Sequence, residues 1–149
     1  MKQMAFFPVL AEEIRQILTG TAWTGVGHAA TPEMRAGFGY ADNEDEEADW
    51  AALTIASVAG LAIPTRIILA AEVSVDVGAD TEFGEVTATV TAADLRAAFR
   101  AEPAQGEGVR AAAEAVTGKR LAGAWDHPAV TALVADQDLL WHLPEEIAG

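Results

Sequence analysis

The sequence of 149 residues contains no cysteine. This absence excludes a disulfide scaffold, a thiolate zinc site, an iron–sulfur cluster held by the chain's own thiols, and a cysteine nucleophile. Serine is nearly absent too. Its two positions, Ser57 and Ser74, do not lie in a G-x-S-x-G motif, which argues against a serine hydrolase. No apolar run approaches the roughly 18 residues of a membrane-spanning helix.

Positive charge is scarce, with 9 Lys and Arg against 23 Asp and Glu and a formal net charge of −14. Such a field repels nucleic acid and anionic membrane surfaces, because both are bound through Lys and Arg. It attracts cationic partners, so a basic protein is the expected partner class, although the charge also favours solubility alone. Residues 1–10 lack the long apolar segment of a signal peptide, which indicates a cytoplasmic protein.

Apolar residues make up 51% of the chain, and 33 residues are Ala. This composition is sufficient for one hydrophobic core, since a chain of this length buries about 68–70% of its unfolded surface. No internal repeat and no polar linker is visible, so residues 1–149 are expected to form a single domain.

The first half of the chain alternates short strands and helices. We expect a strand over 3–9, lying at an edge or ending at Pro8, a helix over 10–19 and a strand over 22–30. The intervening helix suggests that these two strands are parallel. Thr31-Pro32-Glu33 is typical of a helix start, and a longer helix is expected over about 44–60, ended by Gly60 and Pro64.

Residues 66–77 change to a period of two, which predicts a strand with one apolar and one solvated face. Residues 85–91 alternate in the same way and are expected to pair with it as an antiparallel hairpin near the centre of the sheet. Residues 91–102 fit either a helix, begun by a capping box at Thr91 and Asp94, or a strand. Helices are expected at 109–117 and from Pro128, and a buried strand at 139–143.

Together these patterns predict an α+β fold with a mixed or antiparallel sheet of five or six strands and helices packed mainly on one face. A solvated sheet face would remain open to solvent or be covered by a second copy, so both a monomer and a homodimer are compatible with the sequence.

The strongest local feature is a run of six carboxylates in eight residues, just before an apolar helical segment. Its members are Asp42, Glu44, Asp45, Glu46, Glu47 and Asp49. The run lacks the spacing of an EF-hand calcium loop. Carboxylates at a helix start are favoured by the helix dipole, so the run is either a solvated helix start or an acidic binding surface.

The chain has only three histidines, and none forms a helical metal-binding pair. His127 and His142 with a carboxylate such as Asp126 are weak candidates for a metal site. A capping role for His127 and a satisfied core or rim position for His142 are the simpler interpretations. No cofactor motif is complete, because Gly25-Val26-Gly27 and Gly37-Phe38-Gly39 lack the third glycine of a dinucleotide fingerprint.

Four tryptophans carry the largest apolar side chains. Trp50 and Trp141 lie in apolar segments and are expected to anchor the core, whereas Trp23 and Trp125 lie among Gly and Ala and are candidates for partly exposed positions. Three classes of function remain. The first is a non-enzymatic protein that binds through its acidic surface. The others are a small-ligand binding module lined by Trp23 or Trp125, and a metal-dependent or acid–base enzyme using His127 and His142.

Several segments, in the same order, resemble a small actinobacterial protein family that is known only as a domain of unknown function. They are Thr31-Pro32-Glu33-Met34-Arg35, Asp45-Glu46-Glu47 with Trp50-Ala51-Ala52-Leu53-Thr54, residues 66–73, and Asp138-Leu139-Leu140-Trp141 before Pro144-Glu145-Glu146-Ile147. The resemblance favours a strand over residues 95–102. It implies no activity and no catalytic residues.

Overall fold

A computed structural model describes residues 2–62, 67–101, 106–136 and 139–148. Seven strands form one sheet in the order β4-β5-β2-β1-β3-β6-β7, and every neighbouring pair is antiparallel. The strands are β1 (Gln3–Val9), β2 (Trp23–Ala29), β3 (Ile67–Val73), β4 (Asp76–Val77), β5 (Glu85–Val90), β6 (Leu95–Ala101) and β7 (Leu139–His142). The expected α+β class is confirmed, but the sheet has seven strands rather than five or six.

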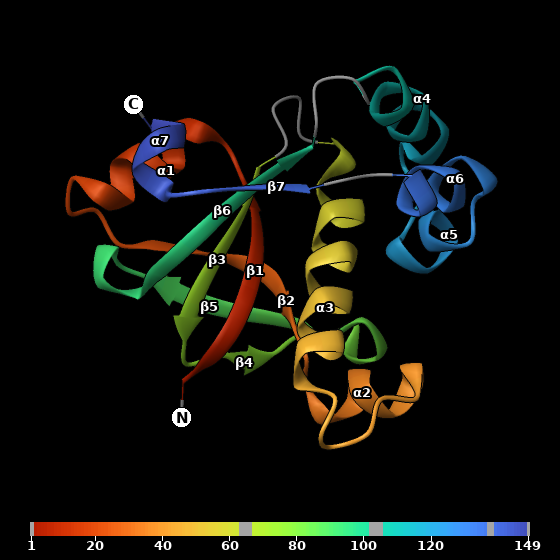
Figure 1. The fold of residues 1–149 in the computed structure, drawn as a ribbon, viewed down its shortest axis with the longest axis horizontal. Helices are drawn as coiled ribbons and strands as arrows, with labels where there is room; N and C mark the ends of the chain where they lie inside the picture. Colours follow the sequence, from red (N-terminus) through yellow and green to blue (C-terminus); the bar gives the residue numbers. More distant parts are fainter. Residues whose placement is uncertain (1, 63–66, 102–105, 137–138, 149) are drawn as a thin grey trace.

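The helices alternate with these strands along the chain and lie against or beside the sheet (Figure 1). They are α1 (Ala11–Leu18), α2 (Pro32–Phe38), α3 (Asp45–Ala59), α4 (Gly106–Val116), α5 (Leu121–Trp125), α6 (Pro128–Asp136) and α7 (Pro144–Ala148), with short 3₁₀ turns η1 (Gly60–Ala62), η2 (Thr81–Phe83) and η3 (Ala92–Asp94). The predicted helix start at Thr31 is present, since its hydroxyl accepts a hydrogen bond from the Met34 N–H. α3 ends at Gly60 as expected, whereas Pro64, which was also expected to end it, lies outside the described residues.

β1 and β2 are antiparallel, which corrects the parallel arrangement expected from the helix between them. The eight residues of α1 span about 12 Å, whereas the seven residues of β1 span roughly 23 Å. The helix is therefore too short to return the chain to the start of β1. Pro8 lies near the end of this central strand, in agreement with the second of the two positions expected for it.

β3 lies in the interior of the sheet, between β1 and β6, and does not pair with β5. Only the two residues of β4 pair with β5, so the expected 66–77/85–91 hairpin is wrong over most of its length. The solvated face expected for this segment is also wrong, because residues 67–71 are buried on both faces. Their run of five apolar side chains fits a strand covered from both sides.

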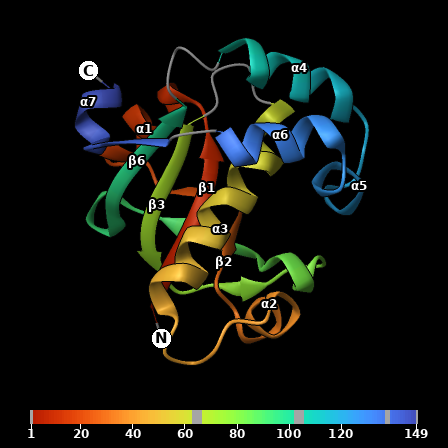
Figure 2. The same ribbon diagram turned by 45° about the vertical axis from the view of Figure 1, so that its right-hand side comes forward.

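Two apolar layers cover the two faces of the sheet. On one face, α3 packs its Ala51, Ala52 and Ile55 against Phe6 of β1 and Ile68 of β3, and Figure 2 shows this helix lying across the sheet. On the other face, Phe7 and Leu69 pack with Ile14 and Ile17 of α1 and with Val86 and Val90 of β5. Helices thus cover both faces, with α3 along one and α1 and α7 together at an end of the other (Figure 1).

Glycines in β2 allow close packing in the apolar layer on the face of the sheet that α1 covers. A Cβ at Gly27 would lie 2.5 Å from both the Phe6 carbonyl oxygen and the Phe7 ring, and a Cβ at Gly25 would overlap the Trp23 ring. Trp23 folds over Gly25, packs edge-on against Phe7 at 5.5 Å between ring centroids, and donates its indole N–H to Glu13. β5 and β3, which are separated by two strands, therefore contribute to the same core cluster.

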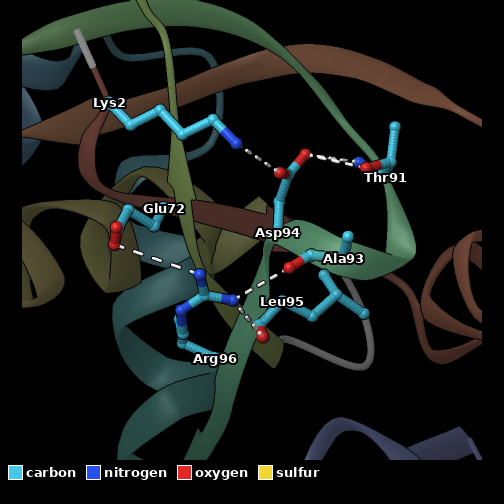
Figure 3. A network of polar contacts seen from close by, with 7 residues as sticks. All are labelled: Lys2, Glu72, Thr91, Ala93, Asp94, Leu95 and Arg96. Atoms are coloured by element: carbon cyan, nitrogen blue, oxygen red, sulfur yellow. Dashed lines mark hydrogen bonds and ion pairs between the residues drawn. The ribbon is translucent and has the colours of Figure 1, made fainter.

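Residues 91–102 combine both of the structures that the sequence allowed. The capping box forms over η3, and β6 then begins at Leu95, as the family resemblance favoured. Asp94 accepts hydrogen bonds from the Thr91 N–H at 2.9 Å and hydroxyl at 3.0 Å, while the Lys2 ammonium lies 3.4 Å away (Figure 3). Burial raises the pKa of Asp94, but these hydrogen bonds outweigh it and lower the pKa overall.

The expectation is wrong for Trp50 and Trp141, whereas Trp23 and Trp125 are partly exposed as expected. Trp50 and Trp141 are 55% and 57% exposed, and the predicted buried strand β7 is an edge strand. Trp23 and Trp125 are partly buried and packed against other aromatic rings. The cause for Trp141 is topological, because apolar side chains on an edge strand have a neighbouring strand on one side only.

Candidate functional site

The acidic run lies at the start of α3, beside α2 (Figure 2). Glu44 precedes the helix, and its carboxylate accepts a hydrogen bond from the Ala41 N–H at 2.9 Å, which fixes the loop before the first turn. Asp45, Glu46 and Glu47 occupy the first turn, where the unpaired helix N–H groups favour negative charge. The run therefore forms a helix start, the first of the two interpretations given by the sequence, and the acidic binding surface stays a prediction.

Arg35 of α2 neutralises part of this run. Its guanidinium lies 2.8 Å from the Asp45 carboxylate and also donates to the Ala30 carbonyl oxygen at 3.2 Å. The side chain of Arg35 is only 21% exposed, so it holds α2 against the start of α3 rather than projecting into solvent. Asp45 is therefore engaged within the molecule, and Glu44 is engaged by its loop.

The other carboxylates differ in their surroundings. Asp42, Glu46 and Glu47 are exposed and form no ion pair with any residue that the structure describes. Asp49 is partly buried, and burial raises the pKa of its carboxyl; the Asp45 charge adds to this effect, while Arg35 opposes it. The charges free to meet a partner are therefore those of Asp42, Glu46 and Glu47.

Trp50 lies on the outer face of α3, one turn beyond Glu46 and Glu47. Residues three and four apart are neighbours on a helix surface, so the exposed indole ring is flanked by both carboxylates. We call the group formed by Asp42, Glu46, Glu47 and Trp50 the acidic Trp50 surface. An arginine can stack on such a ring and at the same time pair with the carboxylates beside it.

A shallow hollow of about 370 Å³ lies beside the Arg35–Asp45 ion pair and is lined by polar and small side chains. The lining residues are Ala30, Pro32, Arg35, Ala36, Tyr40, Asp42 and Asp45. Of the acidic run, Asp42 and Asp45 line this hollow. Small and polar walls favour an extended polar segment over a buried apolar ligand.

The weak metal candidates occupy structural positions. His127 precedes α6, and its Nδ1 accepts a hydrogen bond from the Ala129 N–H at 3.1 Å, which confirms the capping role. His142 lies in β7, with its Nδ1 3.6 Å from the Glu146 carboxylate, and Asp126 ends α5. Among the described residues, no three His, Cys, Asp or Glu side chains are grouped so that they could hold a metal ion.

The tryptophans expected to line a ligand pocket are used differently. Trp23 packs over Gly25, and Trp125 borders an apolar hollow of about 300 Å³ together with Val130 and Val134 of α6. This hollow lies on α5 and α6 rather than between the sheet and the helices. A second, polar hollow of about 390 Å³ lies beside the Lys2–Asp94 pair and is lined largely by Thr and Ser from β2, β5 and the β3–β4 connection.

The exposure of Trp50 was not predicted, although the sequence contains a signal for it. The buried positions of α3 include Ala48, Ala51, Ala52, Ile55 and Ala56, at spacings of three and four. Trp50 falls between these positions and shares its helical face with Glu46 and Glu47. The Arg35–Asp45 pair, in contrast, joins two helices and has no signal in the local pattern.

Comparison with known proteins identifies the family. Residues 4–149 match a family of unknown function, DUF6912, and the chain belongs to this family. The resemblance to a family known only as a domain of unknown function is thereby confirmed. No curated protein and no solved structure matches the chain. Within the described ranges, no helix combines the length and the apolar character needed to cross a membrane.

Proposed function

We propose that this protein is a non-enzymatic binding protein whose acidic Trp50 surface recognises a basic segment of a protein partner. The observation that carries the proposal is the exposed Trp50 ring beside two carboxylates that no described residue neutralises. Leaving a tryptophan exposed forgoes the favourable free energy of burying its large apolar surface, and Trp is the residue type most often found at interface hot spots.

The partner's contact segment contains arginine in this proposal. Arg offers a planar guanidinium that stacks on the indole and donates two parallel hydrogen bonds to a carboxylate, whereas Lys offers a compact ammonium. The net charge of −14 adds long-range attraction and raises the association rate. As part of the same proposal, the protein acts in the cytoplasm of an actinobacterium, a placement supported by the family resemblance.

Replacing Glu46 and Glu47 by Gln is expected to weaken partner binding about tenfold. Each exposed ion pair contributes roughly 0.2–1 kcal/mol, and a tenfold change corresponds to about 1.4 kcal/mol. The measurement is affinity capture of partners from a lysate of the source organism, with mass-spectrometric quantification at low and high salt. Captured partners should be released by salt, because screening shortens the range of exposed charges to about 10 Å at 0.1 M.

A matched control separates the surface from the net charge. Glu12 and Glu145 are exposed, form no ion pair with a described residue and lie on α1 and α7. The Glu12→Gln/Glu145→Gln variant changes the net charge by the same amount and should retain the partners. Equal capture by all three proteins, or an equal loss in both double variants, would contradict the proposal.

A further inference from the structure

The two edges of the sheet differ in how well they are protected from pairing with another strand. β4 at one edge has two residues, one of them Asp76, and short charged strands discourage pairing. β7 at the other edge has four residues, Leu139–His142, none of which is Asp, Glu, Lys or Arg. Its outer side pairs with no strand in the part of the chain that the structure describes.

β7 also carries exposed apolar side chains on both of its faces. Leu140 is 41% exposed and Trp141 57%, and Leu143 directly after the strand is 46% exposed. Pairing with β6 places Leu140 beside Arg100 on one face of the sheet and Trp141 beside Phe99 on the other. An incoming strand would satisfy the free backbone groups of β7 and remove these side chains from water.

We propose that β7 pairs antiparallel with β7 of a second copy of this chain, which joins two sheets across a twofold axis. Such an interface is self-complementary, because the same strand serves as donor and acceptor on both sides. Two chains of net charge −14 repel each other, so a homodimer is favoured where the contacting strand itself carries no acidic side chain and nearby carboxylates can meet a cation. β7 meets this condition, and it lies outside the acidic Trp50 surface.

Charge complementarity supports a second copy of this chain as the partner that pairs with β7. Arg100 is exposed and forms no ion pair with any described residue, and it lies beside Leu140. Antiparallel pairing directs the end of the partner's β7, followed by the acidic start of its α7, toward the end of β7 at which Leu139 and Leu140 lie. Glu146 of that helix lies near His142, on the face of the sheet that also carries Arg100. Each copy thus brings carboxylates toward the unpaired arginine of the other.

The test is the mass of the purified full-length chain in solution, measured by sedimentation over a range of concentrations. We expect a dimer that dissociates on dilution, because a four-residue strand provides less contact than the roughly 800 Å² per partner of stable complexes. Trp141→Lys should raise the dissociation constant at least tenfold. Val77→Lys, at a residue 58% exposed on the other edge strand, should leave the dimer unchanged.

The absence of cysteine permits a second test that requires no disruptive substitution. Facing residues of antiparallel strands lie about 4.5–5.5 Å apart between Cα atoms, within the range of a disulfide. Only the residue on the twofold axis faces its own copy, so either Leu140→Cys or Trp141→Cys should cross-link on oxidation, and Val77→Cys should not. A monomer at all concentrations, a dimer that survives Trp141→Lys, or cross-linking at Val77→Cys alone would overturn the proposal.

Discussion

Replacing Trp125 by Ala is expected to lower the free energy of unfolding by about 3 kcal/mol. Trp125 contacts Phe38 and Phe83 edge-on, with ring centroids 5.9 and 6.0 Å apart, and those two rings contact each other at 6.1 Å. The three rings come from α5, α2 and η2. Removing the largest ring leaves a cavity and breaks two aromatic contacts, each contributing roughly 0.5–1.5 kcal/mol beyond burial.

Trp50→Ala provides the matched control for this prediction, since it removes the same side chain from a position 55% exposed to solvent. Its effect on the free energy of unfolding should remain within about 0.5 kcal/mol. Urea unfolding followed by far-ultraviolet circular dichroism suits both variants, because it does not depend on tryptophan emission. Similar losses in the two variants would show that the aromatic cluster does not hold α5 in place.

Acidification from pH 6.5 to pH 5 is expected to reduce stability through His28. This side chain is 3% exposed, and its Nδ1–H donates to the Phe83 carbonyl oxygen at 2.9 Å. Burial lowers the pKa of His28, although the Phe83 hydrogen bond and the Glu85 and Asp80 charges partly oppose the shift. The His28 imidazole is therefore harder to protonate in the folded state than in the unfolded state, where its pKa is near 6.5.

The direction in which stability changes with pH follows from the difference in the number of protons that His28 binds in the two states. Below about pH 6.5 the unfolded chain binds more protons at His28 than the folded chain, so the free energy of unfolding falls as the pH falls, by at most about 1.4 kcal/mol per pH unit. The raised pKa of Asp49 acts in the opposite direction, and the lowered pKa of Asp94 acts in the same direction. The contribution of His28 is therefore obtained by comparing the wild type with a variant that lacks this histidine.

The measurement is urea unfolding at several pH values in wild type and in His28→Asn, whose side-chain amide retains a donor toward Phe83. The slope of stability against pH should be lower in the variant than in wild type. An unchanged slope would mean that other groups produce the pH dependence and that His28 is not kept neutral by its burial.

Elements with a strong local signal could be predicted from the sequence. The cap at Thr31 and the capping box at Thr91 and Asp94 depend on residues three positions apart, and both are present. The helix over 44–60 has an acidic start and an apolar repeat, and α3 occupies Asp45–Ala59. These features involve interactions within one or two turns, which a local pattern specifies.

The arrangement of the strands depends on contacts that no local pattern contains. β3 lies in the interior of the sheet because its apolar run needs cover on both faces, yet the alternation assigned to residues 66–77 predicted a strand with one solvated face. Trp141 lies in an apolar segment, but its exposure follows from β7 being the last strand of the sheet. The acidic run was expected at a helix start, where it lies, whereas the exposure of Trp50 required knowing which face of α3 the sheet covers.

The proposed binding of arginine-containing segments to the acidic Trp50 surface is tested most directly by nuclear magnetic resonance. The indole N–H groups of the four tryptophans give separate signals that single Trp→Phe variants assign. Titration with a short arginine-rich peptide at low salt should shift the Trp50 indole signal and the backbone signals of Glu46 and Glu47, and added salt should reverse these shifts. Unmoved Trp50 signals, or larger shifts at Trp23, Trp125 or Trp141, would contradict the account.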